Sequence, residues 1–161
     1  MGTYVAKVVW QRGANEPFMN GRYSRAHDWL FDGGARVRGS ASPHTVPPPL
    51  SDPSAVDPEE AFVAALSSCH MLFFLWLAAR RGFAVVSYED SAVGIMSKQA
   101  DGREWVSQVT LRPNVVFDGG QRPNRDEVEA LHHESHDRCY IANSVRTEVL
   151  VEGRASGTSE R

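Results

Sequence analysis

The stretch that decides the fold is residues 57–82, DPEEAFVAALSSCHMLFFLWLAARRG. Asp57 is a good N-cap, Pro58 suits the first helical position, and Glu60 stands where a capping box needs its acid. Gly82 is a helix-stop residue. Together these signals predict one helix of about 24 residues, roughly 36 Å long at the α-helical rise.

This helix is apolar enough to raise the question of a membrane span. Its apolar run is interrupted by Ser-Ser-Cys-His at 67–70 and is flanked closely by charged residues at both ends. The pattern therefore favours a buried helix of a soluble fold or interface. The first ten residues contain one lysine and no continuous apolar segment with a cleavage site, so we expect no secretory signal and a cytoplasmic location.

The segments on either side of the helix alternate as strands do. We expect strands at 4–10, 23–31, 35–42, 83–92, 105–116 and 145–151, a proline-rich loop at 43–58, and a second helix from near Asn124 to near Cys139. The predicted order is β-β-β-α-β-β-α-β, an α+β fold. We expect one domain over residues 1–153 and a disordered tail at 154–161.

Composition excludes several classes of protein. The chain has 161 residues and a formal net charge of −3, which suits a single domain and disfavours a nucleic-acid partner. Its two cysteines are too few for a disulfide framework and form no C-x-x-C pair. The spacing of Cys69 and Cys139 is the feature to explain.

Cys69 lies in the polar notch of the first helix. Plain packing is the commoner role of one cysteine in an apolar helix, but the polar atoms of this notch need partners or a cavity. A reactive thiolate also needs a nearby cation, and the candidates are Arg12, Arg22, Arg25 and His70. His70 follows Cys69 directly and points about 100° away from it, so these two neighbours do not form a catalytic pair.

A second cluster, of histidines and one cysteine, lies on the second helix. His132 and His136 are four residues apart and could reach one ion, with Cys139 nearly a turn further on and His133 beside them. No glutamate stands in an H-E-x-x-H frame and no second cysteine pair is present. We favour a solvated helix face over a metal site and expect neither metal nor cofactor.

Residues 56–71, VDPEEAFVAALSSCHM, and the later His136-x-x-Cys139 resemble the OsmC/Ohr family of osmotically inducible and organic hydroperoxide resistance proteins, in its OsmC-like subgroup. The resemblance covers nearly the whole chain. It implies an intertwined homodimer with sheets wrapped around central helices. It also implies a cysteine-dependent thiol peroxidase, an antioxidant stress-response enzyme that reduces organic hydroperoxides.

The resemblance also implies roles for single residues. Cys69 corresponds to the peroxide-attacking cysteine, Cys139 to the resolving cysteine and Glu59 to the family's glutamate. The arginine corresponds best to Arg25, with Arg22 as the alternative. The chain departs from the family pattern in two places: the turn before the second strand is longer, and Tyr140 follows Cys139 where many members have proline.

These residue types suit the implied chemistry. A guanidinium can hold a thiolate and stabilise the charge of a departing alkoxide, and a carboxylate can orient that guanidinium. A sulfenic acid on Cys69 would condense with Cys139 to a disulfide, which an external dithiol must reduce. For that reductant the resemblance points to lipoylated proteins. The alternative is a non-catalytic protein of this fold that binds an apolar small molecule.

Helix geometry adds a constraint. Ten residues separate Glu59 from Cys69, so on one straight helix they lie about 15 Å apart along the axis. If both serve one site, the glutamate comes from an antiparallel helix of a second copy. We therefore expect a composite active site at a homodimer interface.

Overall fold

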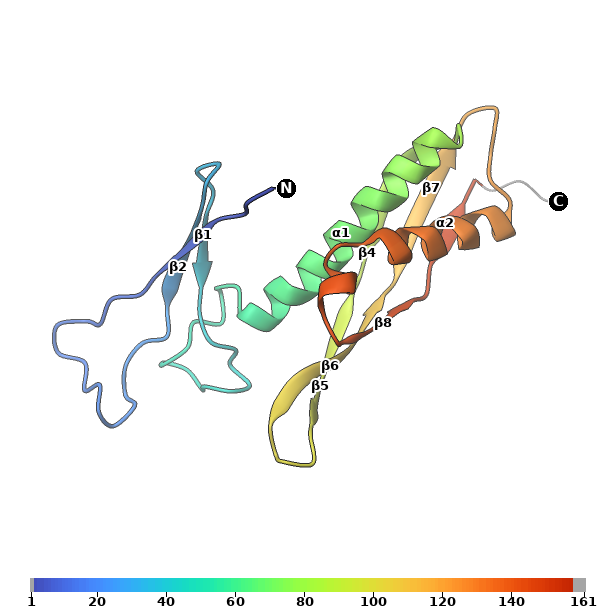
Figure 1. The fold of residues 1–161 in the computed structure, drawn as a ribbon. Helices are drawn as coiled ribbons and strands as arrows, with labels where there is room; N and C mark the ends of the chain where they lie inside the picture. The colour runs from blue at the N-terminus through green and yellow to red at the C-terminus, as the bar shows by residue number, and fades with distance from the viewer. Residues whose placement is uncertain (1, 158–161) are drawn as a thin grey trace. The chain divides into compact units, whose positions relative to one another are not determined.

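The computed structural model describes residues 2–157 (Figure 1). The chain forms two compact units, Met1–Ala61 and Phe62–Arg161, and each is described by itself. The boundary falls within the first turn of helix α1 (Pro58–Arg80). The α+β class predicted from the sequence is confirmed, with two α-helices and nine strands in three sheets among the described residues.

The first unit is built on a small antiparallel sheet. Its strands are β1 (Ala6–Val9), β2 (His27–Phe31) and β3 (Arg36–Gly39), in the order β1-β2-β3. The turn between β2 and β3 contains Gly34 at φ +85°, a left-handed conformation that glycine adopts without strain. Beyond β3, the proline-rich segment forms turns and bends, as predicted, because proline cannot donate a ladder hydrogen bond.

Helix α1 begins and ends where its sequence signals predict. The Glu60 N–H donates to Asp57 Oδ1 at 2.8 Å, and the Asp57 N–H donates to Glu60 Oε2 at 3.0 Å, which completes the capping box. Gly82, at φ +78°, follows the last turn. The helix passes the length and hydropathy test for a membrane span, with a mean hydropathy of 1.9 over its best window, but core helices of soluble proteins pass the same test.

The second unit contains two three-stranded sheets. Strand β7 (Pro113–Asp118) lies between β4 (Ala84–Asp90), to which it is antiparallel, and β9 (Arg154–Ser156), to which it is parallel. Strand β6 (Glu104–Leu111) lies between β5 (Val93–Lys98), to which it is antiparallel, and β8 (Glu148–Val151), to which it is parallel. Helix α2 (Arg125–Arg138) follows β7, and a short helix η1 (Ala142–Ser144) leads to β8.

The structure corrects the predicted strands in several places. Strand β5 was not predicted, and the single strand expected at 105–116 is two, β6 and β7, separated at Arg112. The second strand starts at His27 rather than at residue 23 because the preceding residues form a loop. Strand β9 lies in the expected tail, so the chain is ordered through residue 156, while residues 158–161 of that tail lie outside the described residues.

Two apolar clusters hold the second unit together. The larger joins α1, α2 and β7, and the smaller joins α1 to β6 (Figure 1). The larger contains Phe74, Leu77, Ala78, Phe83, Val115, Phe117, Val128 and Leu131, and the smaller contains Leu66, Val109 and Leu111. Because α1 contributes to both clusters, the polar notch at 67–70 lies between them.

Candidate functional site

The two cysteines are neighbours in the second unit, and both thiols are free. Cys69 is half-buried in the middle of α1, whereas Cys139 is 0% exposed at the end of α2. Burial, together with the nearby Cys69 thiol, raises the pKa of Cys139 to about 11. The pair therefore combines one accessible thiol with one that is buried and protonated at neutral pH.

Backbone contacts fix the position of Cys139. Its N–H donates to the His136 carbonyl at 3.1 Å, and its own carbonyl accepts from the Asn143 amide side chain at 3.0 Å. The Ala142 N–H points at its Sγ, 3.4 Å away. The end of α2 and the start of η1 thus hold this thiol in one place.

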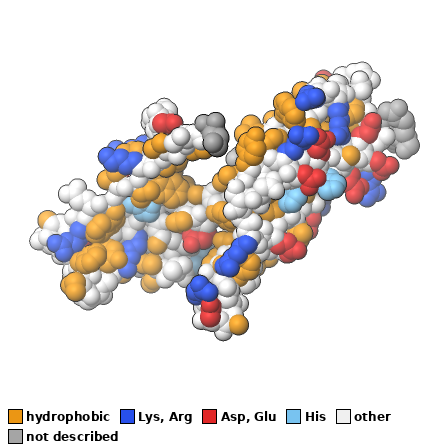
Figure 2. Space-filling model, in the orientation of Figure 1, with side chains coloured by type: hydrophobic (Ala, Val, Ile, Leu, Met, Phe, Trp, Pro, Cys, Tyr) orange, Lys and Arg blue, Asp and Glu red, His pale blue; other side chains and the backbone are white. Residues whose placement is uncertain are grey.

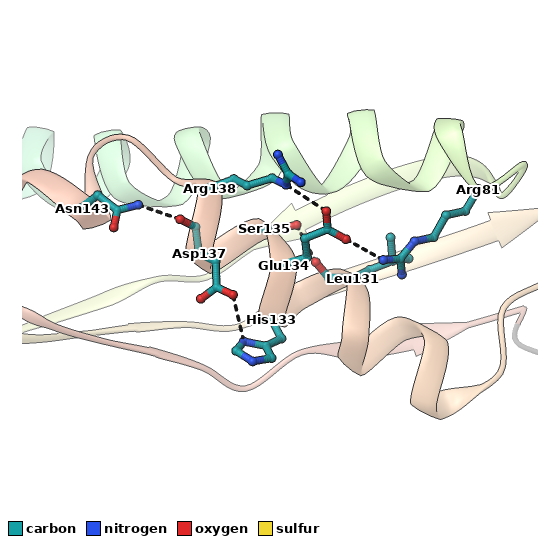
Figure 3. Close-up of polar contacts among 8 residues, drawn as sticks. All are labelled: Arg81, Leu131, His133, Glu134, Ser135, Asp137, Arg138 and Asn143. Carbon is teal, nitrogen blue, oxygen red and sulfur yellow. Dashed lines mark hydrogen bonds and ion pairs between the residues drawn. The ribbon is translucent and has the colours of Figure 1, made fainter.

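A cluster of ion pairs links the C-terminal end of α1 to the C-terminal half of α2 (Figure 3). The Glu134 carboxylate accepts from Arg81 Nη2 at 2.6 Å and from Arg138 Nε at 2.8 Å. Arg138 also lies over the ring of Trp76 on α1, with 5.7 Å between its guanidinium carbon and the ring centroid. These contacts link the two helices that carry the cysteines.

The polar residues of the notch find partners, as the sequence required. Ser67 donates to Asp90 Oδ2 at 2.5 Å, and His70 Nε2 lies 3.1 Å from His132 Nδ1. His70 and His132 are both buried, and burial lowers the pKa of each to about 4. This histidine pair had no signal in the sequence, because nothing local relates residues 62 positions apart.

The two other predicted site residues belong to the first unit. Glu59 is half-buried in the first turn of α1. Arg25 is half-buried in the loop before β2, where its Nη1 donates to the carbonyls of Gly21, at 2.7 Å, and Tyr23. Arg22, the alternative arginine, is exposed. The structure therefore brings Cys69 and Cys139 together, while the placement of Arg25 and Glu59 at one site with them remains an expectation.

The histidines of α2 have different surroundings. Within residues 2–157, no three His, Cys, Asp or Glu side chains are arranged to hold an ion. His132 turns inward to His70, whereas His133 is exposed and faces Asp137, with 3.7 Å between Nδ1 and Oδ2 (Figure 3). His133 thus lies on a solvated face, as the sequence predicted. His132 is buried, so for this residue the prediction was wrong.

Comparisons with known proteins point to one family. The family model described as OsmC-like protein matches residues 51–153. The chain is 53% identical to an OsmC-like protein of unknown function from Vibrio cholerae, with a TM-score of 0.93 over 96% of this chain and 100% of that one. No curated protein sequence matches the chain.

Two more distant structures share the fold. An organic hydroperoxide resistance protein OsmC from Legionella pneumophila is 17% identical, with a TM-score of 0.63 over 97% of this chain and 98% of that one. The organic hydroperoxide resistance protein OhrB of Bacillus subtilis is 16% identical, with a TM-score of 0.58 over 95% of this chain and 98% of that one.

Proposed function

The chain belongs to the OsmC-like protein family, and from this premise we propose that it is a thiol peroxidase that reduces organic hydroperoxides. One observation carries the proposal: a half-buried thiol, Cys69, lies beside a fully buried one, Cys139. A two-cysteine thiol peroxidase uses an accessible thiol to attack the peroxide and a second thiol to capture the resulting sulfenic acid. The names of the Legionella and Bacillus proteins are in keeping with this chemistry.

The first step is attack by the Cys69 thiolate on the O–O bond of the hydroperoxide. The sulfur takes the distal oxygen as a sulfenic acid, and the alkoxide leaves and takes up a proton to become the alcohol. Thiolate and alkoxide both carry negative charge, and a guanidinium stabilises each. We assign this role to Arg25 and propose that Glu59 orients it through a charge-assisted hydrogen bond.

The second step is condensation of the Cys69 sulfenic acid with the Cys139 thiol. An S–S bond forms and water leaves, and an external dithiol then reduces the disulfide and is itself oxidised. The raised pKa of Cys139 keeps this thiol protonated at neutral pH, and therefore slow to react with peroxide itself. We propose a lipoylated protein as the dithiol and the cytoplasm as the location, since a reducing compartment keeps both thiols free.

We further propose that the working form is a homodimer. On α1, a line of exposed residues recurs every fourth position: Ala64, Ser68, Leu72 and Trp76. Leu72 is 62% and Trp76 43% exposed, and hydrophobic side chains reach the surface elsewhere in both units (Figure 2). A second copy would cover this face. Because Glu59 and Cys69 lie about 15 Å apart along one helix, the second copy would also supply the glutamate.

Stopped-flow oxidation by cumene hydroperoxide tests the proposal. We expect the Cys69 thiolate to react far faster than free cysteine, and one equivalent of peroxide to give the intramolecular Cys69–Cys139 disulfide. The Cys69→Ser variant is the matched control. A rate no higher than that of free cysteine would falsify the proposed peroxidase activity. The alternative, a non-catalytic protein that binds an apolar small molecule, would then stand.

A further inference from the structure

The loop before β2 has a small aromatic core of its own. The Phe18 and Tyr23 rings stack with centroids 4.7 Å apart, and the Trp10 ring meets the edge of Tyr23 at 5.4 Å. Trp10 Nε1 also donates to the Ser24 carbonyl at 2.7 Å. These contacts order a segment that contains no strand or helix between β1 and β2. The longer turn noted in the sequence is therefore built around aromatic rings.

Arg25 lies on the edge of this core. Its guanidinium carbon is 3.8 Å from the centroid of the Tyr23 ring. Nη1 donates to the carbonyls of Gly21 and Tyr23, and the Arg25 N–H donates to the Leu50 carbonyl at 2.8 Å. The Tyr23 ring thus covers one face of the guanidinium, and the two carbonyls occupy its Nη1 group. No carboxylate among residues 2–157 pairs with it, and Nη2 and Nε donate no hydrogen bond there.

We infer that Tyr23 is a positioning residue for the reaction, because its ring holds the Arg25 guanidinium with the Nε and Nη2 donors free for an anion. The inference rests on the proposed function, in which that anion is the Cys69 thiolate and then the alkoxide. An aromatic face attracts a guanidinium by its quadrupole. A guanidinium held before the peroxide arrives loses less rotational freedom in the transition state.

The chain offers matched variants for the test. Tyr23→Leu removes the ring, Tyr23→Phe keeps it, and Phe18→Leu disturbs the aromatic core without touching Arg25. In the full-length protein we measure the pH midpoint of Cys69 alkylation and the rate of Cys69 oxidation by cumene hydroperoxide. We expect Tyr23→Leu to raise the midpoint by roughly one pH unit and slow oxidation roughly tenfold, with Tyr23→Phe within about twofold of wild type.

Arg25→Met separates failure of this inference from failure of the proposed function. If Arg25→Met slows oxidation and Tyr23→Leu does not, Tyr23 has no positioning role. If Arg25→Met leaves midpoint and rate unchanged, the assignment of Arg25 in the proposed function is wrong. Should Tyr23→Leu not fold, pentafluorophenylalanine at position 23 keeps the ring's shape but removes its negative face. An unchanged oxidation rate in that protein would equally overturn the inference.

Discussion

His70 Nε2 and His132 Nδ1 lie 3.1 Å apart, and this contact joins α1 to α2 inside the second unit. One ring must donate and the other accept, so each neutral ring keeps one nitrogen for other partners. Those nitrogens, His70 Nδ1 and His132 Nε2, are buried without a hydrogen-bond partner among the described residues. A proton added to either ring would create a buried charge without a hydrogen-bond acceptor among the described residues, and the attraction of Asp90 for His70 offsets only part of that cost.

Stability should therefore fall in mild acid. The pKa of both histidines is about 4 in the fold against 6.5 in the unfolded chain, so the unfolded chain binds more protons between these values. The contribution is complete above pH 6.5 and is lost toward pH 4, by on the order of 3 kcal/mol for each histidine. Urea unfolding between pH 7.5 and 5 measures the slope.

The control for this prediction is His133→Gln, because His133 is exposed on the same helix. It should leave the slope unchanged, whereas His132→Asn should flatten it. An equal slope in wild type and His132→Asn would show that the buried pair does not titrate as expected.

The sequence predicted well the features that depend on neighbouring residues. The cap of α1 is visible because Asp57 and Glu60 are three residues apart, and Gly82 marks its end. Strand β5 was missed because it is exposed at most positions, so no alternation of polar and apolar residues marks it. The residues between β6 and β7 read as one strand because the switch of sheet at Arg112 depends on tertiary packing.

For the candidate site, too, the sequence predicted what depends on neighbouring residues and not the contacts between distant ones. Cys69 stood out locally as part of a polar notch, but its proximity to Cys139 was implied only by the family resemblance, since 70 positions separate them. The partners of the notch, Asp90 and His132, come from other elements and had no local signal.

The Glu134 cluster should stabilise the docking of α2 on α1 (Figure 3). Glu134→Gln removes the charge that Arg81 and Arg138 share. We expect a loss of about 1 kcal/mol in the free energy of unfolding at low salt, and less at high salt, because these side chains are partly exposed. The control is Glu129→Gln, since Glu129 is exposed on α2 and forms no ion pair among the described residues. Equal losses in both variants would contradict a specific role for the cluster.

Gly153 makes room for the His132 ring. A Cβ at this position would lie 2.5 Å from His132 Nε2, and the ring cannot retreat because it contacts His70 and packs on Phe74, with centroids 4.4 Å apart. Gly153→Ala should therefore cost about 2 kcal/mol, as overpacking does. Gly120→Ala, where a Cβ meets nothing within 4 Å, is the control. Thermal unfolding of the two variants tests this prediction, and Gly153→Ala should have the lower melting temperature. Equal melting temperatures would show that the His132 ring does not require glycine at position 153.

Cys139→Ser should change the fate of the oxidised enzyme. Under the proposed function, Cys69 still reacts with the first peroxide, but its sulfenic acid has no thiol partner, so a second equivalent of peroxide oxidises it to sulfinic acid and is itself reduced to the alcohol. Intact-protein mass spectrometry should show a gain of two oxygens in the variant and a loss of two hydrogens in the wild type. A gain of oxygen in the wild type in place of the loss of two hydrogens would argue against Cys139 as the resolving cysteine.

Mixing two inactive variants tests whether the site is shared between copies of the chain. Glu59→Gln and Cys69→Ser should each abolish turnover in their own dimers. If Glu59 of one copy serves Cys69 of the other, each mixed dimer contains one intact site. Subunits mixed in equal amounts, unfolded and refolded together, should then recover about a quarter of wild-type activity, since half of the dimers are mixed and each has one working site of two. A glutamate acting within its own chain predicts no recovery, because neither variant then has a complete site.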